Sequence, residues 1–300
     1  MFKTLKTGLV GAVSACCFAF AVQAEDVSLK NADGLSLGAT LELADGKTVA
    51  DGVVLLTHGT LAHNKMEIIV NLQKLLAERG VSSLAPTLSL GVDSRTGMYD
   101  CTVPTTHKHS DAMVEIGLWL GWLKGQGANN VVLAGHSRGG NQTAWFAARE
   151  NDPLVSKVVL IAPATWTAKG EAKGFEKTHK QPLSKVYAEA EAMVAAGKGA
   201  AFMKGVGVLY CPGADVTADS IVDYYTEDDR MHTPNLLPMI NVPVLVVAGT
   251  NDTVVKGLIE TVEPMADGEK LQLAVIDEAD HFFLDFYIED AADAIAEFIE

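Results

Sequence analysis

The 300-residue sequence has few cysteines, and their positions exclude most of the chemistry that cysteine carries. Cys16 and Cys17 lie in an apolar N-terminal segment, so only Cys101 and Cys211 remain for the rest of the chain. Neither of these two has the C-x-x-C spacing of a redox or zinc site. A dinucleotide-binding motif, a P-loop and a convincing cluster of metal ligands are also missing. We therefore expect no cofactor and no bound metal.

Basic side chains are in the minority. The sequence has 23 Lys and Arg against 38 Asp and Glu, which gives a formal net charge of −15. Proteins that bind nucleic acid need a basic face that contacts phosphates. This balance argues against nucleic acid as a partner. It leaves a small-molecule partner open, because the charge of a site can differ from the net charge, and it does not determine the oligomeric state.

The sequence also lacks an apolar run of the roughly 20 residues that span a bilayer. Its most apolar stretch, "LVGAVSACCFAFAV", follows Lys3 and Lys6 and precedes "VQA". This is the plan of a secretory signal peptide. We therefore expect residues 1–24 to be removed after Ala24 and the protein to be periplasmic or secreted, without stable insertion in a membrane. The alternative is a lipid anchor at Cys16, because "VSAC" resembles a lipobox.

The mature chain, residues 25–300, begins with two alternating segments, "VSLKN" and "LSLGATLEL", which Asp33-Gly34 joins as a predicted hairpin. From Val53 onward, apolar strands alternate with amphipathic helices. Strands are expected in "VVLLTHG", "NVVLAGHS" and "VPVLVVAGTND", and a helix in "KMEIIVNLQKLLAERG". This alternation predicts parallel βαβ units and an α/β fold, in which the C-terminal ends of the strands share one edge of the sheet.

The alternation stops at Thr165 for about 70 residues that are rich in Ala, Lys and Glu. Such a long interruption is usually functional and often forms a lid. We therefore expect residues 165–235 to form a cap over the C-terminal edge of the sheet, without a core of its own. Cys211 lies in this segment and Cys101 in a long loop at the same edge, so we expect an exported protein to join them in a disulfide. Two buried thiols are the alternative.

The stretch "VVLAGHSRGG", residues 131–140, places Ser137 between an apolar strand and a predicted helix. Gly135 and Gly139 complete the pattern G-x-S-x-G, which in this context is typical of a nucleophile elbow. Such a turn is strained and tightly packed, so that a side chain two residues to either side of the serine would clash. It exposes the serine Oγ and points the backbone N–H of Arg138 towards a developing oxyanion. The alternative is a tight turn with an incidental serine.

A serine at its ordinary pKa is a poor nucleophile, so a base and an orienting acid must accompany Ser137. His281 follows "LQLAVIDEAD" and Asp252 follows "VPVLVVAG", so both come directly after predicted parallel strands. We predict that His281 is the general base and that Asp252 orients it. Asp215, within the expected cap, is the alternative acid. Asp280 is a poorer candidate because the side chains of adjacent residues diverge.

Two further loops contain histidines, one at His58 and one at His107 and His109. The strand in "LLTHGT" ends at His58, and we expect the backbone N–H of Thr60 to be the second oxyanion donor, with Leu61 as the alternative. His58 itself is expected to brace this loop through a hydrogen bond. His107 and His109 have H-x-H spacing but no third ligand nearby, so they are interpreted as solvated loop residues.

Taken together, the motifs resemble those of α/β-hydrolase fold serine hydrolases, a superfamily of esterases and lipases. The resemblance spans the mature chain and implies a mostly parallel eight-stranded sheet, flanked by helices and carrying a helical cap insertion. Two features depart from the common pattern: Arg138 is a long charged residue where a smaller or apolar one is usual, and the cap matches no subfamily. The residues that carry the resemblance are His58-Gly59-Thr60, Gly135-His136-Ser137-Arg138-Gly139, Asp252 and His281.

The resemblance implies hydrolysis of a small-molecule carboxylic ester through an acyl-enzyme. Ser137 would be the nucleophile, His281 the base and Asp252 the orienting acid, with the Thr60 and Arg138 amides as the oxyanion hole. A thioesterase or an amidase would use the same groups. A non-catalytic binding protein on the same fold is a further alternative, because fold alone does not determine function. The acyl and alcohol groups of the substrate are not determined by the sequence.

Overall fold

The computed structural model describes residues 24–300. Residues 1–23 lie outside the described residues; they hold all of the predicted signal peptide except Ala24, and the alternative lipid anchor at Cys16, so both stay predictions. In the part of the chain that is described, no helix is long and apolar enough to cross a membrane.

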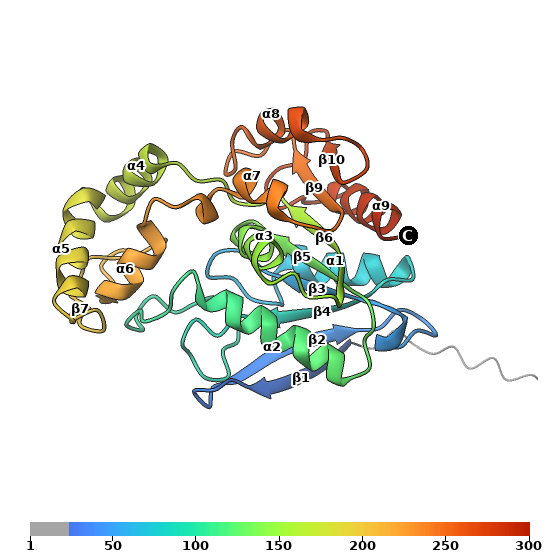
Figure 1. Ribbon diagram of the computed structural model, residues 1–300, viewed down its shortest axis with the longest axis horizontal. Coiled ribbons are helices and arrows are strands. Elements are labelled where there is room, and N and C mark those ends of the chain that lie inside the picture. Colours follow the sequence, from blue (N-terminus) through green and yellow to red (C-terminus); the bar gives the residue numbers. More distant parts are fainter. Residues whose placement is uncertain (1–23) are drawn as a thin grey trace, which may run out of the picture.

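A central sheet of eight strands has the order β1-β2-β4-β3-β5-β6-β9-β10 (Figure 1). Strand β2 runs antiparallel to both β1 and β4, and the remaining neighbours are parallel, which confirms the predicted mostly parallel eight-stranded sheet. The β1–β2 hairpin turns at Asp33-Gly34, as predicted, and Gly34 adopts a φ of 83°. The strands are β1 (Ala24–Lys30), β2 (Ser36–Glu42), β3 (Val53–Thr57), β4 (Ser82–Thr87), β5 (Val131–His136), β6 (Val155–Ile161), β9 (Val244–Gly249) and β10 (Leu271–Ile276).

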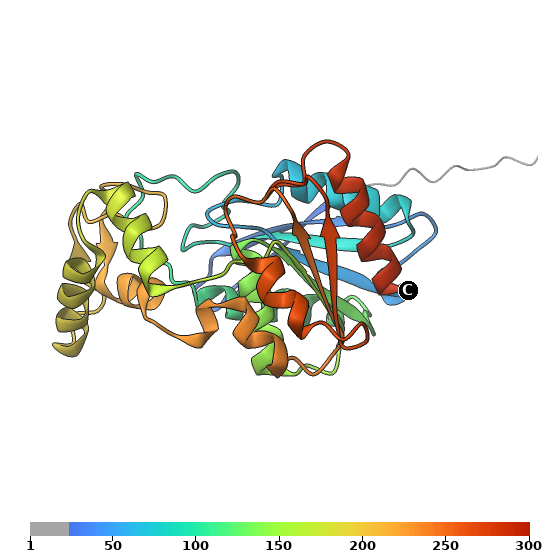
Figure 2. The same ribbon diagram turned by 90° about the horizontal axis from the view of Figure 1, so that it is seen from above.

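Helices cover both faces of the sheet, and this explains why the parallel strands are apolar throughout. Successive side chains of a strand point to opposite faces. Leu55 accordingly packs in one hydrophobic cluster, with α2 and α3, and Leu56 packs in the other, with α1 and α9. The two layers can be followed in Figure 1 and Figure 2. The helices are α1 (Glu67–Glu78), α2 (Asp111–Gly125), α3 (Arg138–Glu150), α8 (Leu258–Val262) and α9 (Tyr287–Ile299), with short 3-10 helices η1 (Val49–Asp51) and η4 (Glu263–Met265).

The segment between β6 and β9 forms a mostly helical lobe beside the sheet (Figure 1; Figure 2). It has a third hydrophobic cluster, which includes Phe175, Val186 and Ile221. The cluster also contains Leu61 and Tyr99, which lie outside this segment, so the expectation of a cap without a core of its own stays a prediction. Its elements are α4 (Ala168–His179), α5 (Leu183–Ala195), β7 (Phe202–Met203), β8 (Val216–Thr217), α6 (Ala218–Tyr225), η2 (Asp229–Met231), α7 (Thr233–Leu236) and η3 (Leu237–Met239).

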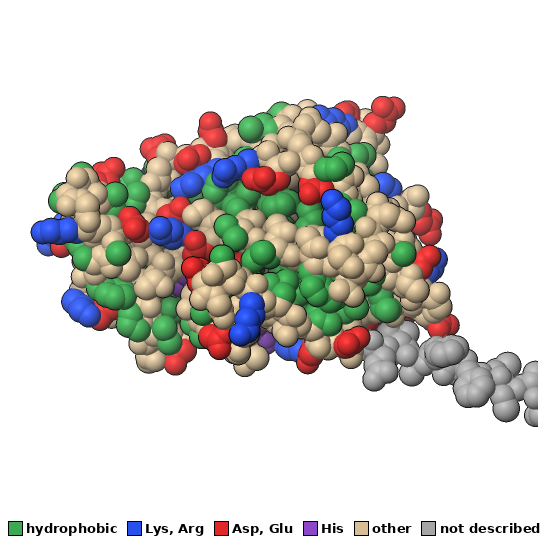
Figure 3. All heavy atoms as spheres, turned by 60° about the horizontal axis from the view of Figure 1, so that its bottom comes forward, with side chains coloured by type: hydrophobic (Ala, Val, Ile, Leu, Met, Phe, Trp, Pro, Cys, Tyr) green, Lys and Arg blue, Asp and Glu red, His purple; other side chains and the backbone are tan. Residues whose placement is uncertain are grey.

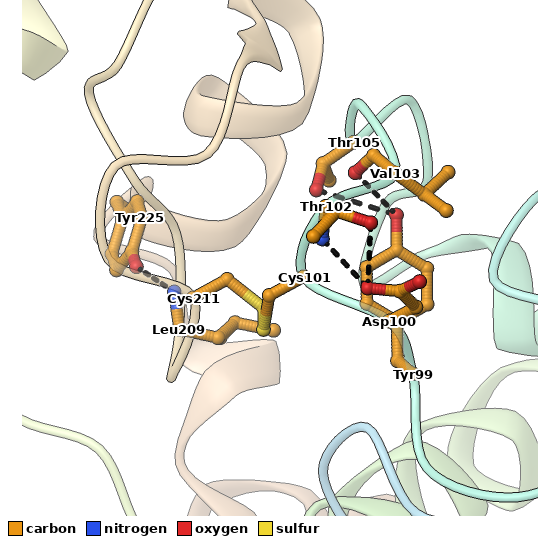
Figure 4. Close-up of a disulfide and its surroundings, with 9 residues drawn as sticks. All are labelled: Tyr99, Asp100, Cys101, Thr102, Val103, Thr105, Leu209, Cys211 and Tyr225. Carbon is orange, nitrogen blue, oxygen red and sulfur yellow. Dashed lines mark hydrogen bonds between the residues drawn. A yellow bond between two sulfur atoms is a disulfide. The ribbon is translucent and has the colours of Figure 1, made fainter.

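The loop between β4 and α2 is bound to this lobe by backbone hydrogen bonds and a disulfide. The Thr105 N–H donates to the Asp215 carbonyl at 2.8 Å, and the Thr217 N–H donates to the Thr105 carbonyl at 3.0 Å. Cys101 and Cys211 form the predicted disulfide, with a Cα–Cα distance of 5.1 Å (Figure 4). The loop and the lobe are thus one composite structure, which we call the cap: residues 88–110 together with residues 162–240.

The surface is polar between scattered apolar patches. On the face that Figure 3 shows, Asp and Glu side chains lie around the rim, with Lys and Arg side chains interspersed among them. Eleven described large hydrophobic side chains are exposed, and several of them surround the site described below.

Reduction of the Cys101–Cys211 disulfide is expected to lower the unfolding temperature. The bond joins residues 110 apart, and closing a loop of this length restricts the unfolded chain by roughly 4 to 5 kcal/mol. Thermal unfolding with and without a reductant measures the effect. The double variant Cys101→Ala/Cys211→Ala is the control: it should unfold at the lower temperature in both conditions. An unchanged unfolding temperature after verified reduction would contradict the prediction.

Candidate active site

Ser137 lies in a sharp turn between β5 and α3, with φ of 56° and ψ of −123°. The turn is packed so closely that the two flanking glycines cannot carry side chains. A Cβ on Gly135 would lie less than 3.0 Å from the Gly139 carbonyl oxygen, and a Cβ on Gly139 would lie less than 3.0 Å from the His58 carbonyl oxygen. The backbone conformation is one that L-residues rarely adopt, and it presents the Ser137 side chain to the cavity described below.

Ser137, His281 and Asp252 form a hydrogen-bonded chain. The His281 Nε2 lies 2.9 Å from the Ser137 Oγ, and the His281 Nδ1 lies 2.7 Å from the Asp252 Oδ2. Because ionised Asp252 can only accept, Nδ1 carries the proton and Nε2 is free to accept from the serine hydroxyl. The side chains of His281 and Asp252 are each 5% exposed. The structure therefore brings together the three residues that the sequence analysis selected, while their catalytic roles stay predictions.

Asp252 is kept ionised by its hydrogen bonds. Burial alone would raise the pKa of this carboxyl, but a hydrogen bond from His281 and two from backbone amides outweigh it, so the pKa lies below its usual value. The two amides, of Val254 and Val255, donate to Oδ1 at 2.7 and 2.9 Å. A charged, fixed carboxylate can hold the imidazole in one orientation and stabilise it once it is protonated.

The two alternative acids, Asp280 and Asp215, make their hydrogen bonds to groups other than His281. The Asp280 Oδ1 accepts the backbone N–H of Phe282 at 3.0 Å, so it caps a turn beside His281. Asp215 lies in the cap, where the Lys204 Nζ contacts it at 2.7 Å and the Gly205 N–H donates to it. Neither carboxyl is hydrogen-bonded to His281, so among the described residues Asp252 alone has the position of an orienting acid.

His136, the residue before Ser137, supports His281 from behind, a contact that the sequence analysis missed. Its Nε2 donates to the His281 carbonyl oxygen at 2.9 Å, and the two ring centroids are 4.8 Å apart. Burial lowers the pKa of His136 to about 4, so the ring is neutral at pH 7 and its single proton is on Nε2. The variable position of the G-x-S-x-G pattern thus fixes the backbone that carries the predicted base.

His58 braces the loop that follows β3, as predicted. Its Nδ1 donates to the Gly59 carbonyl at 2.8 Å, and its Nε2 accepts the Leu88 N–H at 3.0 Å. Burial lowers the pKa of His58 to about 3, which keeps the ring neutral. The buried Arg95, which no sequence motif identifies, donates to the carbonyls of Ala62 and Leu88 at 2.6 and 2.7 Å. These contacts fix the loop on both sides.

The backbone amides of Thr60 and Arg138 are available to a substrate. Among the described residues, neither amide donates to a protein acceptor. The loop lies against the elbow, because a Cβ on Gly59 would be 3.2 Å from the Ser137 Cβ. Thr60 lines the cavity beside Ser137, whereas Leu61, the alternative donor, packs into the hydrophobic cluster of the cap. This geometry favours Thr60 over Leu61, and its role as a donor stays a prediction.

A cavity of about 260 Å³ opens beside Ser137 and His281. Most of its lining is apolar, and no Lys or Arg is among the lining residues. Two partly exposed residues of the cap reach it: Met98 lies three residues before Cys101, and Tyr210 is next to Cys211. The disulfide thus holds together the two cap segments at the mouth. The other apolar lining residues are Ala62, Met66, Ile68, Ile69, Val254 and Phe282.

His107 and His109 are not solvated, so that expectation was wrong. Each is 1% exposed, because the lobe covers the loop on which they lie. The Tyr224 hydroxyl hydrogen-bonds to the His107 Nδ1 at 2.7 Å, and the His109 Nε2 donates to the Asn141 Oδ1 at 2.9 Å. Burial lowers the pKa of His107 to about 3 and that of His109 well below its usual value. In the described part of the chain, no group of three potential ligands could hold a metal ion.

Comparisons with known proteins support the fold described above. The family model described as "Alpha/beta hydrolase family" matches residues 53–298. The ferulic-acid complex of Est1E from Butyrivibrio proteoclasticus superposes with a TM-score of 0.63 at 19% identity, covering 90% of this chain and 96% of that chain. The Pyrococcus furiosus esterase Pf2001 gives a TM-score of 0.59 at 17% identity, covering 93% and 90%. The esterase domain of a Rhodothermus marinus protein gives 0.56 at 15%, covering 92% and 96%. At these identities the likeness shows the fold alone, and a search of curated proteins gives no significant match.

The elbow should not tolerate a side chain at its glycines. Gly139→Ala is expected to destabilise the protein by ~3 kcal/mol or more, because its Cβ would overlap the carbonyl groups of Thr57 and His58. Gly121→Ala is the matched control, because no heavy atom lies within 4 Å of the position that its Cβ would take in helix α2. Denaturant unfolding of the two purified variants measures the difference. Equal midpoints would show that the close approach at Gly139 is not a constraint.

Proposed function

The chain belongs to the alpha/beta hydrolase family, and we propose that it is a serine hydrolase that cleaves carboxylic esters through an acyl-enzyme intermediate. One observation carries the proposal: the hydrogen-bonded chain from the Ser137 Oγ through His281 to Asp252, which opens on an apolar cavity. A buried imidazole with its Nε2 on a hydroxyl and its Nδ1 on a carboxylate is the arrangement that can remove the proton from a serine as the serine attacks a carbonyl carbon.

In the proposed mechanism, the Ser137 Oγ attacks the ester carbonyl carbon while the His281 Nε2 accepts its proton. The carbonyl oxygen becomes an oxyanion, which the backbone amides of Thr60 and Arg138 bind. The tetrahedral intermediate then collapses: the bond from carbon to the alcohol oxygen breaks, and His281 returns the proton to the departing alcohol. A water molecule, activated by the same imidazole, hydrolyses the acyl-Ser137 ester. Asp252 stays ionised throughout and stabilises the imidazolium.

The lining of the cavity supports an uncharged substrate with an apolar group. A charged acyl group would lose hydration on entering, and no Lys or Arg among the lining residues would compensate it. The lysines of α4 and α5 do not line this cavity either. Thioesters and amides could use the same groups, so they belong in the substrate test.

Export from the cytoplasm is part of the proposal. The disulfide between Cys101 and Cys211 supports it, because such bonds persist in oxidising compartments such as the bacterial periplasm. The N-terminal signal pattern of the sequence points the same way. N-terminal sequencing of the protein recovered outside the cytoplasm checks the expected cleavage after Ala24.

Ser137→Ala and His281→Ala are each expected to abolish ester hydrolysis with the fold intact, whereas Asp252→Asn should retain more activity. The three residues of a catalytic triad act as a unit, so removing the serine or the histidine alone removes most of the activity. Loss of the orienting acid often lowers kcat less. A fluorophosphonate probe should label the wild type on Ser137 and leave Ser137→Ala unlabelled. Asp215→Asn is the matched control for the acid. Labelling of another residue, or a dead Asp215→Asn beside a fully active Asp252→Asn, would contradict the assignment.

A panel of p-nitrophenyl esters tests the substrate class. Neutral acyl chains of intermediate length should be preferred to the acetate, and all of them to the anionic hemisuccinate. Tyr210→Ala and Met98→Ala should extend the preference to longer chains, because both side chains lie at the cavity. Phe202→Ala is the matched control: it is an exposed residue of the lobe that does not line the cavity. A preference for the hemisuccinate, for thioesters or for anilides would reassign the substrate.

A further inference from the structure

We propose that the Arg138 guanidinium is a positioning group, which holds the loop of Thr60 against the elbow of Ser137 and ties both to the cap. The inference rests on the proposed function, because it concerns the two residues whose amides would form the oxyanion hole. It gives a role to the long charged side chain that follows the serine.

The first contact joins the two predicted donors to each other. The Arg138 Nε donates to the Thr60 Oγ1 at 3.1 Å. Thr60 lies in the loop after β3 and Arg138 is the first residue of α3, and each contributes one unpaired amide. An oxyanion hole stabilises charge only if both N–H groups point at the same place. A side-chain hydrogen bond between the two residues fixes the distance between the Thr60 loop and the start of α3.

The second contact anchors the other side of the guanidinium. The Arg138 Nη1 lies 3.3 Å from the His109 Nδ1. His109 is buried, and its Nε2 proton goes to the Asn141 Oδ1, so its Nδ1 is the nitrogen that can accept. The Arg138 Cζ also lies 5.6 Å from the centre of the Tyr224 ring, in α6 of the lobe. Both halves of the cap therefore contact the same side chain.

The charge of Arg138 is not used in an ion pair. In the part of the chain that the structure describes, no carboxylate lies within 4.0 Å of its guanidinium, whereas the nearby Arg230 pairs with Asp223 at 3.6 Å and Asp228 at 3.5 Å. Arg138 is also not among the residues that line the cavity. It would therefore act through Thr60 and its own backbone and not by touching the substrate, which makes it a positioning residue.

The geometry requires an arginine. Its Nε and Nη1 reach two acceptors in different directions, the Thr60 hydroxyl and the His109 ring, from one planar group. A lysine has a single flexible ammonium that cannot reproduce this fork. Replacement of Arg138 by Lys preserves the positive charge and removes the two directed hydrogen bonds. This variant therefore separates an effect of charge from an effect of positioning.

The experiment compares Arg138→Met, Arg138→Lys and Thr60→Val with the matched control Arg149→Met, at the opposite end of helix α3. On the neutral p-nitrophenyl ester that the wild type prefers, Arg138→Met and Arg138→Lys should each lower kcat roughly 10- to 100-fold, with KM changed by less than about twofold. Thr60→Val keeps its amide and should lower kcat in the same way. The double variant Arg138→Met/Thr60→Val should lose no more kcat than Arg138→Met alone, because Arg138→Met already removes the contact that Thr60→Val removes.

A transition-state analogue separates positioning from a general structural effect. A trifluoromethyl ketone forms a tetrahedral adduct with an oxyanion, so its affinity should fall in the Arg138 variants by the same factor as kcat/KM. The unfolding temperature of Thr60→Val should stay at the wild-type value. Arg149→Met should keep the wild-type kcat, KM and affinity for the trifluoromethyl ketone.

Three results would overturn the inference while leaving the proposed function intact: full kcat in Thr60→Val, multiplicative losses in the double variant, or full rescue by Arg138→Lys. A wild type that neither hydrolyses esters nor labels at Ser137 would overturn the proposed function, and this inference with it.

Discussion

The close approach of the β5–α3 turn to the loop after β3 is the constraint on which the site depends. Because Gly135 and Gly139 have no Cβ, the first turn of α3 can pack directly on backbone atoms of the sheet and of the His58 loop. Ser137 then adopts a positive φ and extends its side chain towards His281. The same approach brings the loop of Thr60 against the turn that carries Ser137 and Arg138, so that one strained turn organises the nucleophile and the expected oxyanion hole together.

Around this turn, buried neutral histidines do most of the positioning. His58 fixes the loop, His136 holds the backbone of His281, and His109 accepts from Arg138. Burial lowers the pKa of each of them, so each keeps one proton and presents one donor and one acceptor. A buried charged group would need a counter-charge in these places, whereas a neutral imidazole needs only a donor on one side and an acceptor on the other.

The fold and the three central residues could be predicted from the sequence because their signals are local. The strand before Ser137, the glycines beside it and the strand ends before Asp252 and His281 are each visible within about ten residues. The cap could not be predicted in the same way. Its pairing with the 88–110 loop depends on contacts between residues 110 positions apart, such as Thr105 with Asp215, and of these only the disulfide left a sign in the sequence.

The histidine contacts were missed for the same reason. His107 and His109 look solvated when the loop is considered alone, and they are buried only because the lobe packs against it. Arg95 belongs to no motif, and its role follows from three carbonyl groups that the fold brings to one point. Sequence patterns identify the groups that would react, whereas the groups that hold them in place emerge from the packing.

The central claim is that Ser137 becomes acylated during turnover. Mass spectrometry of the acid-quenched reaction with p-nitrophenyl trimethylacetate, whose hindered acyl group slows deacylation, tests it most directly. We expect an initial burst of about one equivalent of p-nitrophenolate per chain, and the mass of one trimethylacetyl group on the peptide that contains Ser137. Turnover without a covalent adduct on that peptide, or an adduct on another residue, would contradict the account.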